Sequence, residues 1–253
     1  MIFLYFVGTA GSGKTTLTYA FQQWMNLQGY DAITVNLDPG VEKLSYVPDV
    51  DIRETISLSG VMEEYNLGPN GAQIVCADLL ALKINEVKEI VDGFDSDYVL
   101  IDTPGQIELF AFREASKHII EAFDINNSAM AFLFDPFLSK NPSGFISQVM
   151  LSATTQFRFH LPFINVLSKS DLLDEKEKDR IMNWVKQPED LLNDAVNEEA
   201  SMEKQLSIEL FRVLEDMGVY KILTPVSSET MTGMEDIYNL VQQVFMGGED
   251  LEK

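Results

Sequence analysis

A glycine-rich segment near the start of the chain has the residue types that bind the phosphates of a nucleotide. It spans residues 8–15, reads GTAGSGKT, and stands between an apolar run at 2–7 and a helical pattern at 16–26. Glycines let backbone N–H groups converge on phosphate oxygens, and a helix N-terminus adds partial positive charge. Lys14 would then reach the β- and γ-phosphates, and the Thr15 hydroxyl would ligate Mg²⁺. The flanking strand and helix disfavour the alternative of a flexible turn, so we predict a nucleoside triphosphate site made by Gly11, Ser12, Gly13, Lys14, Thr15 and Thr16.

A second segment with catalytic residue types follows the apolar run at 98–101. A strand there would deliver Asp102 to the edge of a sheet, where its carboxylate holds Mg²⁺ through a water molecule. Gly105 can present its backbone N–H to a γ-phosphate and so sense whether that phosphate is present. Gln106 and Glu108 are polar groups that could position the attacking water. A D-x-x-G pattern is common by chance, but after a phosphate-binding loop and an apolar strand it indicates a GTPase-type switch.

Two further segments permit both a structural and a functional interpretation. Asp38 follows an apolar strand at 32–37 and so lies on the rim where open α/β sheets bind ligands, but Asp-Pro-Gly is also an ordinary turn. Spacing alone does not decide between these interpretations. The segment at 67–71, Leu-Gly-Pro-Asn-Gly, would hold the Asn70 side chain rigidly, because its proline fixes φ and its second glycine allows positive φ. Periodicity alone favours a tight turn before the helix expected at 72–91.

A third signal is the sequence Ser-Lys-Ser-Asp at 168–171, which follows an apolar strand. The Asp171 carboxylate can accept hydrogen bonds from both N1–H and the exocyclic amine of guanine, a donor pair that adenine lacks. The stem of Lys169 can lie over the base. Asparagine is more usual at the position of Ser168, and an isolated Lys–Asp pair would indicate only a surface loop. A loop at Ser227, after the last expected strand, could close over the guanine.

Composition limits the classes of protein and partner. The 253 residues include 40 acidic and 18 basic side chains, and the resulting net charge of −22 argues against binding to nucleic acid or an anionic membrane. A single cysteine, Cys76, permits no intrachain disulfide, and no apolar run is long enough to span a bilayer. We therefore expect a cytoplasmic protein. Its acidic surface could bind a basic protein client, or could simply keep the protein soluble.

The alternation of apolar strands with helical patterns predicts an α/β fold of the P-loop NTPase class. We expect a mostly parallel sheet flanked by helices on both faces, in a single domain over residues 1–253. Helical insertions are expected near 52–72 and, rich in acidic residues, near 174–204. A loop is expected at 41–51 and one continuous helix at 107–123.

The segments at 8–15, 68–70, 102–106 and 168–171, in this order along the chain, resemble those of the GPN-loop GTPases. The resemblance extends over essentially the whole chain, and its distinguishing mark is Gly-Pro-Asn at 68–70. It implies an obligate homodimer in which each protomer inserts this loop into the partner's active site, so that Asn70 contacts the phosphate end of the nucleotide in trans. It also implies that Asp38, Gln106 and Glu108 orient the attacking water and that Asp102 supports Mg²⁺.

Three functions compete on this basis. The leading hypothesis is a homodimeric, Mg²⁺-dependent enzyme that hydrolyses GTP to GDP and phosphate. The second is a nucleotide-gated assembly factor or chaperone in which hydrolysis is a timer; the resemblance suggests an RNA polymerase-like client, because eukaryotic members of the family are associated with polymerase assembly and nuclear import. The third is a small-molecule kinase, which the guanine-type segment and the lack of an obvious Arg-rich lid disfavour.

Overall fold

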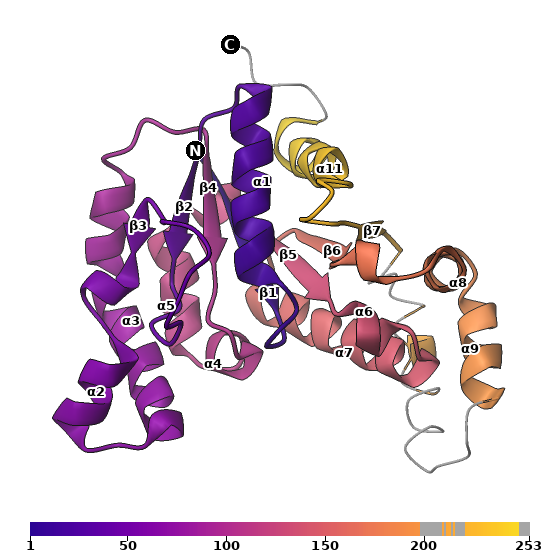
Figure 1. Cartoon of the computed structure of the whole chain (residues 1–253), viewed down its shortest axis with the longest axis horizontal. Coiled ribbons are helices and arrows are strands. Elements are labelled where there is room, and N and C mark those ends of the chain that lie inside the picture. The colour runs from indigo at the N-terminus through magenta and orange to yellow at the C-terminus, as the bar shows by residue number, and fades with distance from the viewer. Residues whose placement is uncertain (198–208, 210, 214, 216–220, 248–253) are drawn as a thin grey trace. The chain divides into compact units, whose positions relative to one another are not determined.

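A parallel β-sheet forms the centre of the structure, a computed structural model that describes residues 1–197, 209, 211–213, 215 and 221–247. Within these residues seven strands form one sheet, in the order β3-β2-β4-β1-β5-β6-β7 (Figure 1). The pairs β1–β4, β2–β4, β2–β3 and β6–β7 are all parallel. The strands are β1 (Ile2–Gly8), β2 (Ala32–Asn36), β3 (Val50–Asp51), β4 (Tyr98–Asp102), β5 (Ser128–Phe134), β6 (Phe163–Leu167) and β7 (Leu223–Pro225).

Helices alternate with these strands along the chain, as the sequence predicts. None of the helices in the described ranges is long and apolar enough to cross a membrane. The α-helices are α1 (Lys14–Gln28), α2 (Leu58–Tyr65), α3 (Pro69–Val91), α4 (Ile107–Ala111), α5 (Ala115–Ala122), α6 (Pro136–Ser139), α7 (Pro142–Phe159), α8 (Glu175–Lys186), α9 (Pro188–Asn197) and α11 (Met234–Met246). Short 3₁₀ turns occur at η1 (Ile52–Glu54), η2 (Ile125–Asn127) and η3 (Ser170–Leu172).

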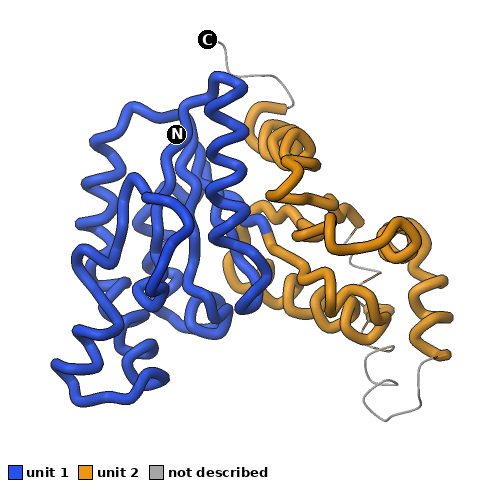
Figure 2. The backbone as a smooth tube through the Cα atoms, viewed as in Figure 1, with its two compact units in different colours: residues 1–131 blue, residues 132–253 orange. Residues whose placement is uncertain are grey.

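The chain divides into two compact units, residues 1–131 and residues 132–253 (Figure 2). The first unit contains the phosphate-binding loop, and the second contains the segment expected to bind guanine. The expectation of a single domain over the whole chain stays a prediction.

In the first unit, β1 is packed on both faces, as its uninterrupted apolar run predicts. The ring of Phe3 lies 5.2 Å from that of Phe123, which follows α5, whereas Phe6 lies 6.1 Å from Phe21 of α1. Successive side chains of a strand point to opposite faces, so α1 and the α5 segment cover opposite faces of β1. Figure 1 shows α1 in front of the strands. The predicted α/β class with helices on both faces of the sheet is confirmed.

In the second unit, aromatic side chains connect the sheet to its helices. Phe145 of α7 lies 5.7 Å from Phe134 of β5 and 5.7 Å from Trp184 of α8, measured between ring centroids. The indole of Trp184 is fully buried, and its Nε1–H donates to Asp194 of α9 at 2.8 Å. The acidic insertion is therefore helical and packed at 175–197, while its expected end at 198–204 lies outside the described residues.

Three local expectations were wrong, each for a physical reason. The expected loop at 41–51 ends in β3, a strand of only two residues that alternation patterns do not reveal. Helix α3 begins at Pro69 rather than at 72, because the fixed φ of proline suits the first turn of a helix. The expected helix at 107–123 is interrupted at 112–114, where Arg113 forms a bidentate ion pair with Asp78 of α3.

Candidate active site

The carboxyl ends of three neighbouring strands bring the predicted catalytic segments of the first unit to one edge of the sheet. The register pairs Asp102 of β4 with Phe6 of β1 on one side and with Asn36 of β2 on the other. The phosphate-binding loop follows β1, and Asp38 follows β2. Parallel sheets bind ligands at this edge, so the topology itself collects these residues.

The phosphate-binding loop has the backbone conformation that its glycines predict. Gly11 and Gly13 have φ of 77° and 97°, in the left-handed region that other residues rarely adopt. Gly13 is the N-cap of α1, and Lys14 begins the helix. Three residues with hydroxyl groups complete this loop and the first turn of α1: Ser12 is buried, Thr15 is half-buried and Thr16 is exposed.

The ammonium group of Lys14 is held by three carbonyl groups. Its Nζ donates to the carbonyl oxygens of Gly8 and Thr9 at 3.0 Å each, and to that of Gly105 at 2.9 Å. Lys14 is only 5% exposed. Burial lowers the pKa of Lys14, and the nearby carboxylates of Asp102, Asp38 and Glu108 act in the opposite direction without cancelling the effect. The structure thus brings the predicted lysine and the predicted switch segment into direct contact.

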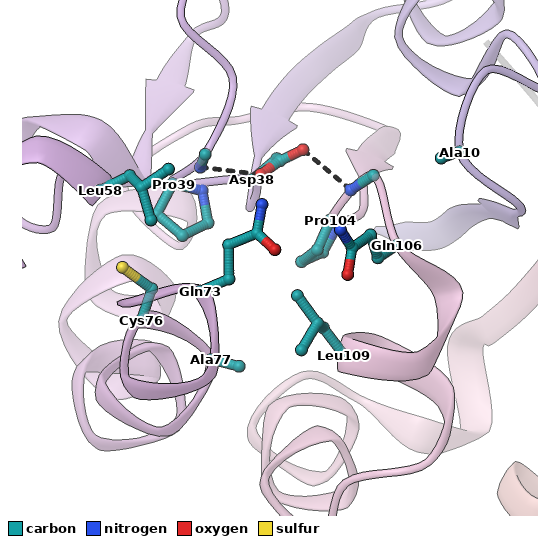
Figure 3. Close-up of a pocket in the computed structure, with 12 residues that line it drawn as sticks. Ala10, Asp38, Pro39, Leu58, Gln73, Cys76, Ala77, Pro104, Gln106 and Leu109 are labelled. Carbon is teal, nitrogen blue, oxygen red and sulfur yellow. Dashed lines mark hydrogen bonds between the residues drawn. The ribbon is translucent and has the colours of Figure 1, made fainter. Parts of the chain in front are cut away.

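The Asp38 carboxylate bonds to the same switch segment. Its Oδ2 accepts a hydrogen bond from the backbone N–H of Gly105 at 2.8 Å, and its Oδ1 accepts one from Gly40 at 2.8 Å (Figure 3). The bond to Gly40 is that of an ordinary Asx turn. The bond to Gly105 places an anionic oxygen on the N–H predicted to sense a γ-phosphate. Asp38 therefore combines the two alternatives that spacing left open: it forms a turn and it reaches the site.

Asp102 has the environment of a cation ligand. The residue is 1% exposed, and neither carboxylate oxygen makes a hydrogen bond of ordinary geometry within the described part of the chain. Burial raises the pKa of Asp102 to about 7, although the Thr15 hydroxyl and the Lys14 ammonium lie close enough to lower it. Buried carboxylate oxygens without partners are costly. A divalent cation between Asp102 and Thr15 would satisfy them, so these residues fit the predicted Mg²⁺.

A cavity of about 110 Å³ opens beside Asp38 and Gly105 (Figure 3). Gln106 and Gln73 lie on its wall. Figure 3 shows the Gln73 amide pointing toward Asp38 and the Gln106 amide beside Pro104. The rest of the wall is mostly apolar and includes Leu58, Cys76, Ala77, Pro104 and Leu109. Such a lining excludes bulk water while the amides and the carboxylate can hold a single water molecule. Glu108 is exposed in the first turn of α4, and Gln106 is the N-cap of this helix.

One residue of this site, Gln73, lacks a sequence signal of its own. Gln73 lies on the wall of the cavity and is placed there by the second turn of α3. Asn70 lies about one turn earlier, in the first turn of α3, but its side chain is exposed and it is not one of the cavity's lining residues. The structure of the first unit therefore brings together Lys14, Thr15, Asp38, Asp102, Gly105 and Gln106, and leaves Asn70 outside this group.

In the second unit, the two loops expected to bind the base lie side by side. The N–H of Ser170 donates to the carbonyl of Val226 at 2.9 Å, which joins the loop after β6 to the loop after β7. Ser168 is buried, and its hydroxyl donates to the carbonyl of Phe134 at 2.9 Å, so it anchors the loop to β5. Lys169 has a φ of 48°, an uncommon value for a residue with a side chain.

The side chains that would contact the base are accessible from this arrangement. Asp171 is exposed, and Lys169 is partly exposed. The Ser227 hydroxyl is buried and accepts a hydrogen bond from the N–H of Thr230 at 3.1 Å, so it shapes its loop.

Comparisons with known proteins identify the family of the chain. The profile of a family described as "Conserved hypothetical ATP binding protein" matches residues 6–247. GPN-loop GTPase PAB0955 of Pyrococcus abyssi is 33% identical over 248 residues, which cover 97% of this chain and 98% of that protein. GPN-loop GTPase 3 of Eremothecium gossypii is 32% identical over 252 residues, covering 97% and 92%. The crystal structure of PAB0955 in its apo form matches with a TM-score of 0.86 at 32% identity, over 96% of this chain and 97% of the other. The chain belongs to the family of GPN-loop GTPases.

Proposed function

We propose that this protein hydrolyses GTP to GDP and phosphate, with Mg²⁺ as cofactor and with its active site completed across a homodimer. The GTPase activity itself is supported by relatives along nearly the whole chain that are named GTPases. The single observation that carries the chemistry is the convergence of Lys14 and Asp38 on the two backbone groups of Gly105.

Binding of the γ-phosphate exchanges one set of contacts for another. In the structure, Lys14 donates to the Gly105 carbonyl and Asp38 accepts from the Gly105 N–H. A γ-phosphate offers oxygens to both donors, so it takes Lys14 and the Gly105 N–H from their internal acceptors. The Asp38 carboxylate is thereby released. It can then accept a hydrogen bond from the water that attacks the γ-phosphorus, with Gln106 and Gln73 holding the same water.

Mg²⁺ would be held by the Thr15 hydroxyl and, through water, by the Asp102 carboxylate. A cation bound there would neutralise the negative charge that develops on the phosphate oxygens during hydrolysis. The chain's own part is to hold the buried Asp102 carboxylate beside Thr15, with both of its oxygens left for the shell of the cation.

Guanine selectivity is assigned to the second unit. The exposed Asp171 carboxylate presents two acceptors to the N1–H and the exocyclic amine of guanine. The Lys169 stem lies over the base, and the Ser227 loop, tied to the same segment through Val226, closes the other side.

Asn70 is assigned to the partner's active site. It is exposed in the first turn of α3, which begins at Pro69. An exposed amide on a helical backbone is accessible to a partner, and it can donate to a phosphate oxygen. The same amide supplied across a dimer would do the work that an arginine finger does in other GTPases.

A second candidate function is that of a nucleotide-gated assembly factor for a protein complex, with hydrolysis as its timer. The first turns of α8 and α9 carry two acidic residues each, and the chain has a net charge of −22. Such a surface suits a basic client segment. A variant that binds GTP without hydrolysing it separates the functions, because a gated assembly factor would still bind its client.

The test of the enzymatic function is phosphate release from GTP and from ATP, with Mg²⁺ and after its removal by a chelator. We expect hydrolysis of GTP that requires Mg²⁺ and is abolished by Lys14→Ala, and much slower hydrolysis of ATP. A preference for ATP would contradict the assignment of Asp171, and unchanged activity without Mg²⁺ would contradict the assignment of Asp102.

A further inference from the structure

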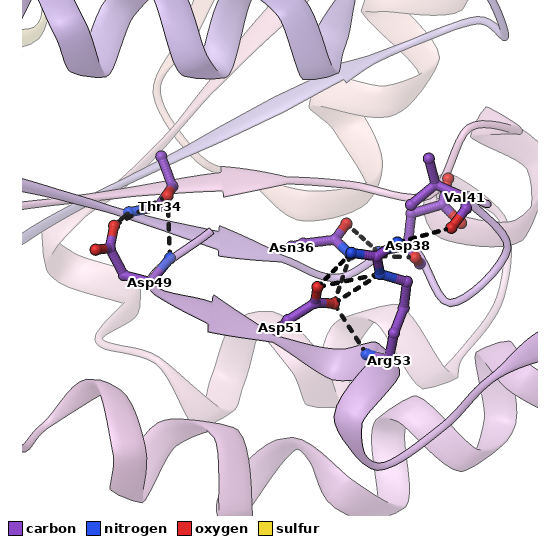
Figure 4. A network of polar contacts seen from close by, with 7 residues as sticks. All are labelled: Thr34, Asn36, Asp38, Val41, Asp49, Asp51 and Arg53. Carbon is purple, nitrogen blue, oxygen red and sulfur yellow. Dashed lines mark hydrogen bonds and ion pairs between the residues drawn. The ribbon is translucent and has the colours of Figure 1, made fainter. Parts of the chain in front are cut away.

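The edge strand β3 brings two polar side chains together beside Asp38. The parallel register of β2 and β3 sets Asn36 opposite Asp51. The Asn36 Nδ2 donates to Asp51 Oδ1 at 2.9 Å (Figure 4). The Asp51 side chain is only 13% exposed. A strand of two residues thus supplies a largely buried carboxylate immediately behind the turn that carries Asp38.

Asn36 holds both backbone polar groups of Asp38. Its Oδ1 accepts from the Asp38 N–H at 3.0 Å, and its Nδ2 donates to the Asp38 carbonyl at 3.3 Å. The Asp51 carboxylate can only accept, so it fixes which end of the Asn36 amide faces the strand and which end faces Asp38. The amide therefore cannot turn over without losing all three bonds.

Arg53 closes the other end of the same turn. Its Nε and Nη2 donate to Asp51 at distances down to 2.6 Å, and its Nη1 donates to the Val41 carbonyl at 3.1 Å. Burial acts to raise the pKa of Asp51, but hydrogen bonds from Arg53 and Asn36 outweigh it and hold the pKa below its ordinary value. Asp51 is thus a permanent acceptor at neutral pH, and it holds the turn at both ends, Asp38 through Asn36 and Val41 through Arg53.

We propose that Asn36, Asp51 and Arg53 are positioning residues for GTP hydrolysis, which fix the turn at 38–41 and thereby the place of the Asp38 carboxylate. The proposal rests on the function proposed for Asp38. None of the three touches the nucleotide; they act through the backbone of Asp38. A carboxylate that orients water must stand within a fraction of an ångström of its working position.

The strand pair also contains a matched control. Asp49 Oδ2 accepts from the Thr34 N–H at 2.8 Å and the Thr34 hydroxyl at 3.0 Å (Figure 4). It also accepts from the Gln22 amide at 2.9 Å. Asp49 therefore joins the same two chain segments with the same residue type, two positions before Asp51. Its bonds do not lead to Asp38. Loss of Asp49 should weaken the fold without moving the catalytic turn.

The first experiment compares Asp51→Asn, Arg53→Gln and Asp49→Asn in the full-length protein. We measure kcat under saturating GTP, the Kd for GTP, and thermal unfolding. Asp51→Asn and Arg53→Gln should lower kcat by about tenfold or more while the Kd for GTP changes little, because a small displacement of a catalytic group has effects of this size. Asp49→Asn should lower the melting temperature and leave kcat near wild type. Equal kcat losses at 49 and 51, or normal kcat in folded Asp51→Asn, would overturn the proposal.

A double-mutant cycle separates this proposal from the role of Asp38 itself. If Asp51 acts through Asp38, then adding Asp51→Asn to Asp38→Ala should cause no further loss of kcat. Additive losses would overturn the proposal while leaving the role of Asp38 intact. Normal kcat in Asp38→Ala alone would instead refute the function proposed for Asp38, and the positioning proposal with it.

A pair of substitutions that exchanges the carboxylate and the amide between positions 36 and 51 tests whether kcat can be restored. Asn36→Asp alone sets two carboxylates against each other and should lower kcat strongly. Adding Asp51→Asn lets the new amide at 51 donate to the new carboxylate at 36. The acceptor for the Asp38 N–H is retained, and only the longer bond to the Asp38 carbonyl, 3.3 Å in the wild type, is lost. The double variant should recover about tenfold in kcat over Asn36→Asp. No recovery in a folded double variant would overturn the proposal.

Discussion

Removal of the Asp38 carboxylate is expected to tighten GTP binding while it slows hydrolysis. In the structure, Asp38 Oδ2 accepts from the Gly105 N–H at 2.8 Å, and a γ-phosphate must take this donor over. In Asp38→Ala the donor has no internal acceptor, so the γ-phosphate binds without having to displace one. GDP has no γ-phosphate and does not use this donor, so its affinity should stay unchanged.

The magnitude follows from the bond that is exchanged. A hydrogen bond to a charged acceptor contributes about 1.5–3 kcal/mol, and the lower end applies because Asp38 is only half-buried. A gain of ~1.5 kcal/mol corresponds to roughly tenfold tighter binding of GTP. Loss of a positioned proton acceptor lowers kcat by about 10²–10⁴-fold. Affinity for GTP and turnover should therefore move in opposite directions.

The assay is isothermal titration with GTP and with GDP, alongside single-turnover hydrolysis. Asp38→Asn is the matched control, since it keeps an oxygen acceptor for Gly105 but removes the charge, and its affinity for GTP should lie between those of the wild type and Asp38→Ala. Weaker binding of GTP by Asp38→Ala, with GDP unaffected, would refute the reasoning. Asp38 would then help to hold the γ-phosphate and would not compete with it.

The remaining predictions concern the dimer, the cation site and the base. Asn70→Ala should lower kcat much more than it lowers the affinity for GTP. The specific activity of the wild type should rise with protein concentration until the dimer is complete. Full activity in a monomer, shown by mass measurement, would contradict the trans role of Asn70. Burial raises the pKa of Asp102 from 3.8 to about 7, so the carboxyl is protonated in both the folded and the unfolded state below about pH 4, and stability is lost progressively as the pH rises from 4 to 7. Urea unfolding without nucleotide should show up to roughly 4 kcal/mol of this loss between pH 4 and pH 8 in the wild type and none of it in Asp102→Asn; equal pH profiles would contradict the burial of that carboxylate. Asp171→Asn should weaken GTP binding and improve that of xanthosine triphosphate, whose 2-keto group accepts from an amide; unchanged selectivity would contradict base recognition by Asp171.

The fold could be predicted because its elements have strong local signals. The apolar run that becomes β1, the glycines with positive φ and Lys14 at the start of α1 are contiguous in sequence. Their structure depends mainly on chain stereochemistry and on burial, which the sequence shows directly. The strand that precedes Asp38 and the strand that ends at Asp102 are of the same kind, so the sheet edge that collects these residues was also predictable.

The contacts that give the site its character could not be predicted, because they join segments distant in sequence. The bond from Asp38 to Gly105 joins two loops that only the order of the strands brings together. Asp51 lies in a strand of two residues that has no periodicity to detect, and its partner Asn36 looks like an ordinary end of a strand. Gln73 has no signal at all apart from its place one turn after Gly-Pro-Asn.

One measurement tests the central claim most directly: a crystal structure of the protein with Mg²⁺ and a non-hydrolysable GTP analogue. We expect the Gly105 N–H to donate to a γ-phosphate oxygen, Lys14 to have left the Gly105 carbonyl, and the Asp38 carboxylate to face a water molecule beside the γ-phosphorus. An Asp38 carboxylate still bonded to the Gly105 N–H, with the triphosphate in place, would contradict the claim that the γ-phosphate and Asp38 compete for the same donor.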